Sequence, residues 1–184
     1  MSSSLVLLDE FTVSSGVSAV TLGAGSNGSS SFNYSMDSTY DVYKVVTINV
    51  QIDTDVQPVK KRFTVSGSAV TSSSYDMAFQ RLRSENSFED KHATDQDSFG
   101  NLDSIGTAAN EQQNEIIYIF NASNSSEFTV ATFETAQLIH DSSHFHGLAG
   151  GVALTETSAV DGITFFSGSG NIDAGTFKLY GLNK

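Results

Sequence analysis

Three histidines lie close together in the sequence, His140, His144 and His146, with Asp141 between the first two. Imidazole nitrogens are common ligands of zinc and other transition metals, and a carboxylate can complete such a site. On a β-strand, His144 and His146 would point to the same face because side chains alternate along a strand. The three histidines are therefore the candidate metal ligands. The alternatives are ordinary polar residues at a strand end and a pH-sensitive contact.

Acidic residues occur in close pairs at three places, Asp53/Asp55, Glu89/Asp90 and Asp95/Asp97. Carboxylates at this spacing suit calcium, a hard cation that binds oxygen ligands. However, no window of the sequence has the loop pattern of an EF-hand, and charge clusters usually lie on solvated surface. We therefore expect surface charge at these pairs rather than a calcium site.

Serine, aspartate and histidine are abundant, but their order and spacing single out no catalytic triad. The sequence has no nucleophile elbow of the Gly-x-Ser-x-Gly type in a strand–turn–helix context. It also has no phosphate-binding loop and no dinucleotide-binding fingerprint. We therefore expect that this protein is not an enzyme and, apart from the metal considered above, that it has no cofactor.

The elements that must position these residues are predicted to be strands almost throughout. Tyr40–Ile52 is the clearest strand, because Val42, Val46, Ile48 and Val50 share one parity and predict an apolar inward face. Gly, Asn and Ser punctuate about ten such short strands, which is typical of a β-sandwich or jelly roll. We expect an all-β, single-domain antiparallel sandwich over residues 1–184.

Residues 85–115 differ from this pattern. They are polar and acidic, and their apolar residues, such as Phe88 and Phe99, have no sustained period. The segment predicts one long irregular loop within the domain. A loop of this length is uncommon in a compact domain unless it has a role, so the alternatives are a surface excursion and an arm that packs on a neighbouring subunit.

The composition excludes several classes of protein. The 184 residues include 9 Lys and Arg against 21 Asp and Glu, a net charge of −12, so we expect no nucleic-acid partner. The absence of cysteine excludes disulfides, thiolate zinc sites and thiol nucleophiles. No apolar run reaches the roughly 20 residues that span a bilayer, and no basic segment precedes Leu5–Leu8. We therefore expect no membrane partner and no secretory signal.

The C-terminal part resembles a recurrent ending of tailed-bacteriophage virion proteins, roughly "A-I-x-x-I-x-F … G-N-F-x-x-G-S-x-x-L-Y-G-I". The matching residues are 159–166 and 169–182, which end Leu179-Tyr180-Gly181-Leu182. The opening strand and residues 40–46, similar to the family's "tYddLklv", carry the same resemblance. The sequence departs from the pattern at Ile172, where an aromatic residue is preferred, and the middle of the chain is unmatched.

This resemblance implies a β-sandwich or jelly-roll module on the outside of a phage particle, commonly a homotrimer. Our first expectation is a capsid decoration (cement) protein that contacts the major capsid protein and stabilises the head. It would be assembled in the host cytoplasm and located on the virion exterior. The alternative is a tail fibre or baseplate appendage that binds host surface carbohydrate.

We expect subunit and capsid contacts from the N-terminal strand and from the 85–115 segment. The candidate interface residues are Leu5, Leu7, Phe88 and Phe99. Phe32 and Tyr34 are further aromatic candidates in polar loops. Interfaces are enriched in aromatic residues, but so are cores, and the alternative for each aromatic is a place in the core.

Overall fold

The structure is a computed structural model, and it describes residues 4–85, 87–100, 103–141 and 144–182. Within these ranges more than half of the residues lie in strands, and the one helix is a short 3-10 turn, η1 (Gly25–Asn27). No helix in the described part of the chain is long and apolar enough to cross a membrane. The expectation of an all-β antiparallel sandwich is confirmed.

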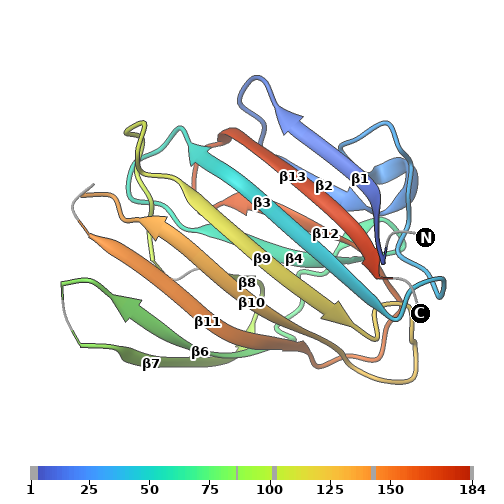
Figure 1. The fold of residues 1–184 in the computed structure, drawn as a ribbon. Coiled ribbons are helices and arrows are strands. Elements are labelled where there is room, and N and C mark those ends of the chain that lie inside the picture. The colour runs from blue at the N-terminus through green and yellow to red at the C-terminus, as the bar shows by residue number, and fades with distance from the viewer. Residues whose placement is uncertain (1–3, 86, 101–102, 142–143, 183–184) are drawn as a thin grey trace.

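Two antiparallel sheets form the sandwich, and Figure 1 looks onto the larger one with the smaller behind it. Across the larger sheet the order is β1 (Leu5–Val13), β13 (Ile172–Leu182), β3 (Val42–Ile52), β9 (Gln113–Phe120), β10 (Thr129–Leu138), β11 (Phe145–Leu154), β6 (Tyr75–Arg83) and β7 (Glu89–Gln96). The smaller sheet has the order β2 (Ala19–Gly23), β12 (Val160–Ser167), β4 (Val59–Val65) and β5 (Ser68–Ala69), and β8 (Phe99–Gly100) also pairs with β4.

The core lies between the sheets because every second side chain of each strand points inward. The ring of Phe99 packs against Phe63 at 5.0 Å and against Tyr75 at 5.5 Å between ring centroids. Phe165 and Phe177 form a second inter-sheet contact at 5.2 Å. Phe99, expected at an interface, is therefore a core residue with 2% of its surface exposed. Its short strand β8 pairs with β4 and directs the ring inward.

Strand β3 faces the opposite way from the sequence prediction over its first half. Tyr43 and Val45 are buried in the core, whereas Val46 is only partly buried and Ile48 is 40% exposed. A break in the β3–β9 register between Thr47 and Val50 then restores the predicted parity at the end of the strand. Both parities of β3 are apolar, so the pattern alone could not choose the inward set.

The single irregular loop predicted for residues 85–115 is only partly present. Strand β7 pairs with β6 at the edge of the larger sheet, and β8 joins the smaller sheet. The side chains of β7 are mostly polar, so the alternation of apolar residues did not predict this strand. An edge strand needs few inward apolar residues. Residues 103–112, which lie between β8 and β9 in the chain, form no strand of either sheet.

Candidate interaction surface

The side of the larger sheet that faces away from the smaller sheet is called the outer face here. On β9, the buried residues Ile117 and Ile119 alternate with outward-facing Ile116, Tyr118 and Phe120, which are partly exposed. The solvated side of an antiparallel sheet normally has polar side chains at these positions. The central strand of the outer face is therefore apolar on both sides.

The neighbouring strands extend this apolar area. The register places Val46 of β3 beside Ile116, and Phe120 beside Val130 of β10. Ile48 and Val130 are 40% and 39% exposed, and no strand or loop crosses in front of β3, β9 and β10 in Figure 1. These positions define the central patch, which consists of Val46, Ile48, Ile116, Tyr118, Phe120 and Val130.

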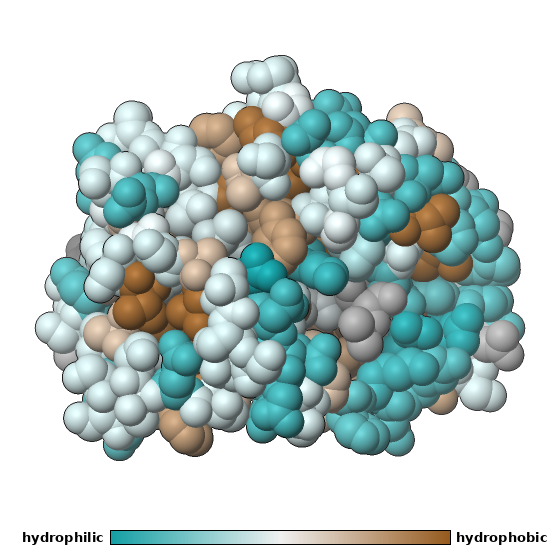
Figure 2. Space-filling view, turned by 180° about the vertical axis from the view of Figure 1, so that it is seen from behind, coloured by the Kyte–Doolittle hydropathy of each residue, from teal (hydrophilic) through white to brown (hydrophobic). Residues whose placement is uncertain are grey.

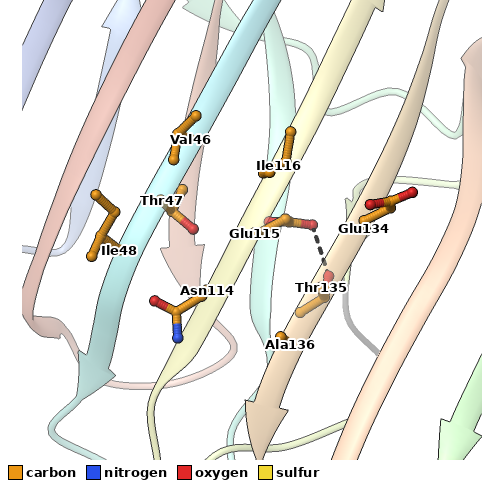
Figure 3. A pocket seen from close by; sticks show the side chains of 9 residues that line it. All are labelled: Val46, Thr47, Ile48, Asn114, Glu115, Ile116, Glu134, Thr135 and Ala136. Atoms are coloured by element: carbon orange, nitrogen blue, oxygen red, sulfur yellow. Dashed lines mark hydrogen bonds between the residues drawn. The ribbon is translucent and has the colours of Figure 1, made fainter.

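A shallow hollow of about 360 Å³ lies in this face where the β3–β9 register breaks (Figure 3). Ile48, Ile116 and Ala136 give it apolar walls, and Asn114 lies at its edge. Asn114 Oδ1 accepts a hydrogen bond from the backbone N–H of Asn49 at 2.9 Å, which fixes the bulge that opens the hollow. Such a hollow suits an apolar side chain rather than a reacting group.

The charges on these strands are few and balanced. Glu10 and Lys178 form an ion pair at 3.3 Å on neighbouring strands β1 and β13. The Lys44 ammonium lies 5.5 Å from the ring centroid of Tyr118. Within the described residues, neither Lys44 nor Glu134 has an ion-pair partner. The central strands therefore present one unpaired cation and one unpaired anion.

The opposite side of the molecule has a different character. Figure 2 shows mostly hydrophilic and neutral-polar atoms there, with apolar residues in small separate areas. Partly exposed outward positions of the smaller sheet include Lys60, Arg62 and Thr21, and the Arg62 guanidinium covers the ring of Phe166 at 4.6 Å. The unusual apolar surface therefore lies on the outer face of the larger sheet.

The structure separates the candidate metal ligands His144 and His146. His144 lies before β11 and contacts Asp141 at 3.0 Å, whereas His146 points inward and is buried. The ring nitrogens of His146 lie 2.8 Å from carboxylate oxygens of Asp103 and Glu85. Both ring nitrogens of His146 are therefore engaged by carboxylates rather than by a neighbouring histidine.

The backbone N–H of His140 donates to the carbonyl of Ser104 at 3.3 Å, and His140 lines a hollow together with His146. In the described ranges, no group of three or more His, Cys, Asp or Glu side chains is arranged to hold a metal ion. A metal at His140, His144 or His146 stays a prediction.

His146 belongs to a cluster of charges at one end of β6 and β11. Burial pushes the pKa of Glu85 upward, but hydrogen bonds from His146 and Arg83 outweigh it and lower the pKa to about 2. A hydrogen bond from Lys91 and the nearby Arg83 likewise lower the pKa of Glu89. The cluster joins β6, β7 and β11 through charge-assisted hydrogen bonds, which is a structural role.

The acidic pairs are also tied to neighbouring segments. Both carboxylate oxygens of Asp53 accept hydrogen bonds from Asn171, at 2.7 and 2.8 Å, and these bonds lower the Asp53 pKa. Asp97 accepts a hydrogen bond from Ser98 and pairs with Arg62, and both contacts lower its pKa. These carboxylates hold turns and strand ends together.

The remaining candidate interface residues differ in exposure. Leu7 is 42% exposed on the outer face, and Leu5 lies on the same strand and is partly buried. Phe88 is 63% exposed and precedes β7, at the far edge of the larger sheet. Tyr34 is part-buried, and its hydroxyl lies 3.3 Å from that of Tyr43.

Sequence reasoning missed the central patch. Its signal was present in β9, where Ile116-Ile117-Tyr118-Ile119-Phe120 is apolar at every position. An unbroken apolar run indicates a strand that is covered on both faces. Only the sheet order shows that one of those faces is open in this chain.

Comparisons with protein-family models, curated proteins and solved structures found no match to this chain. The class of protein is therefore defined by the fold and the surface alone. It is an all-β antiparallel sandwich of two unequal sheets, in which the larger sheet has an apolar outer face.

Proposed function

We propose that this chain is a structural protein of a tailed-phage virion, a homotrimeric decoration protein that stabilises the exterior of the capsid. One observation supports this most directly. The segments that resemble phage virion proteins are distant in sequence, but three of them form the adjacent strands β1, β13 and β3 of the larger sheet. The fourth, residues 159–166, forms β12 of the smaller sheet, which packs on β13 through the contact of Phe165 with Phe177.

A contact between two of the resembling motifs strengthens the argument. Gly181 stands in the Leu-Tyr-Gly-Leu ending, and Tyr40 stands at the tyrosine of the motif at residues 40–46. A Cβ atom on Gly181 would lie 2.5 Å from the Tyr40 ring, so the ring packs directly on the glycine backbone. The two motifs therefore depend on one another physically, as parts of one module would.

The surface offers a mechanism for stabilisation. An apolar face that copies or capsomers can cover adds buried area to the particle, and this raises the free energy of disassembly. The net charge of −12 disfavours contact with packaged DNA and supports a place on the outside. No step of this proposal needs catalysis or a cofactor.

The location on the particle tests the proposal. We expect electron microscopy of virions labelled for this chain to place it on the head. We expect particles that lack it to lose heat and osmotic stability while they still adsorb to cells. Location on the tail, with normal stability but failed adsorption, would overturn the capsid proposal. It would support the appendage alternative, which glycan-array binding then tests.

A further inference from the structure

We propose that the outer face of the larger sheet is the surface through which copies of this chain associate, with the central patch at its middle. The inference deepens the proposed function and rests on it for the biological setting. It names the contact surface and the residues that align the copies. The arguments are the area of the face and its charges.

The area is sufficient for a stable contact between copies. The six strands from β1 to β11 have 8 to 11 residues each. With strands about 4.8 Å apart and about 3.3 Å of rise per residue, the face measures on the order of 900 Å². A stable protein–protein interface buries about 800 Å² on each partner.

The charges favour a copy of the same chain over another occupant. The central strands carry Lys44 and Glu134, neither with an ion-pair partner in the described residues, together with the internal pair Glu10–Lys178. These charges sum to zero, and the exposed Asp173 at the start of β13 brings the solvent-facing side chains of the six strands to a net charge of −1, in a chain with a net charge of −12. Two copies that meet elsewhere on the acidic surface repel each other, whereas this face is close to neutral and has one charge of each sign to offer at its centre.

The geometry brings these two charges together between copies. Lys44 on β3 and Glu134 on β10 flank β9. Lys44 lies beside Tyr118 and Glu134 beside Ile116, so they are two residues apart along the strands. A two-fold axis parallel to β9 places the β3 side of one copy over the β10 side of the other. Each Lys44 then lies two residues along the strands, about 6.6 Å, from the Glu134 of the other copy, and the long flexible lysine side chain can span that distance.

Light scattering coupled to size-exclusion chromatography tests the inference on the purified chain. We expect the wild type to be an oligomer and Ile116→Lys to be a monomer, because the substitution buries an unpaired charge in the contact. Phe32→Lys is the matched control. Phe32 is 59% exposed in the loop between β2 and β3, outside the outer face, and its replacement leaves the oligomer intact. Circular dichroism confirms that each variant is folded.

Charge reversal supplies a second test that does not depend on one variant. We expect Lys44→Glu and Glu134→Lys each to raise the dissociation constant by roughly tenfold or more, since like charges then face each other. The double variant Lys44→Glu/Glu134→Lys restores the wild-type value. Failure of that rescue would overturn the proposed alignment of the copies.

A monomeric wild type, or dissociation by Phe32→Lys as readily as by Ile116→Lys, would overturn the inference itself. Its failure is distinguishable from that of the proposed function. A patch-dependent oligomer of a protein that is absent from phage particles leaves the inference standing and contradicts the virion role. A dimer through this face supports the inference and contradicts the proposed trimer.

Discussion

The Nζ atom of Lys61 lies 2.8 Å from both carboxylate oxygens of Glu115, and this buried ion pair links the two sheets. Lys61 lies on β4 of the smaller sheet and Glu115 on β9 of the larger sheet, and their side chains are 0% and 2% exposed. Thr135 donates a further hydrogen bond to Glu115 at 3.3 Å. A charge in this place is tolerated only because its partner is present.

Replacement of one partner of this pair is expected to be severe. Lys61→Met leaves the Glu115 carboxylate buried without its cation, and we expect a loss of about 3–5 kcal/mol in the free energy of unfolding. The double variant Lys61→Met/Glu115→Met removes both charges and is expected to recover most of that loss. Urea unfolding measures both variants, and Lys60→Met on the outward side of β4 is the control. A mild effect of Lys61→Met alone would contradict the importance of the pair.

The acidic pH dependence of stability follows from the carboxylates of the charge cluster. The pKa of Glu85 falls from its ordinary value of 4.5 to about 2 on folding, so the folded state binds this proton less readily than the unfolded state. The resulting stabilisation is complete above about pH 4.5 and is lost as the pH falls through about 2. Glu89 and Asp97, whose pKa values are also lowered, act in the same direction.

Thermal melts between pH 2 and pH 7 check this expectation. We expect the melting temperature to fall steadily over the lower half of that range. Glu85→Gln, which has no proton to bind there, is expected to show a shallower fall than the wild type. Identical slopes for the two proteins would show that Glu85 does not contribute to the acid sensitivity.

Gly175 is expected to be essential at its position in β13. It has a φ of 134°, and a Cβ atom there would lie 3.0 Å from the Cα of Val50 on β3. Residues with a side chain rarely adopt this backbone conformation, so Gly175→Ala is expected to lower the free energy of unfolding by about 1–3 kcal/mol. Gly16→Ala is the control, because its Cβ would make only ordinary contacts at 3.6 Å. Equal stability of the two variants in denaturant unfolding would rule out strain at Gly175.

The different environments of Phe99 and Phe88 lead to a paired prediction. Phe99 packs in the core against Phe63 and Tyr75, so Phe99→Ala is expected to cost about 3–5 kcal/mol. Phe88 is 63% exposed, and Phe88→Ala is expected to change stability by less than about 0.5 kcal/mol. Chemical denaturation distinguishes the two residues, and similar costs would contradict the assigned burial.

Much of the fold could be predicted from the sequence because strands follow local alternation. Alternation is visible in β10, where Ala131 and Phe133 are buried between exposed neighbours, and Ile163 and Phe165 of β12 are buried in the core. The edge strand β7 could not be predicted, since its polar residues gain their strand conformation from pairing with β6. The place of Phe99 also depends on a long-range pairing, of β8 with β4.

Less of the candidate interaction surface could be predicted from the sequence. Leu7 was expected at an interface and lies on the outer face. Two residues of the central patch, Val46 and Ile48, were assigned to the inward face, and its other residues were assigned to neither face. The histidines looked like one cluster, whereas backbone direction turns His146 inward to Asp103 and leaves His144 near the surface. Spacing along the chain does not determine which carboxylates meet an imidazole in three dimensions.

The sequence by itself determined the class of the protein, because composition and alternation of side chains are local properties that leave few alternatives to an antiparallel sandwich. The tertiary structure alone decided which face of β3 and β9 is inward. Both faces of these strands are apolar, and a bulge at Ile48–Asn49 changes the parity between the two ends of β3. The exposed apolar face of the larger sheet is a consequence of strand order, which depends on contacts between residues far apart in the chain.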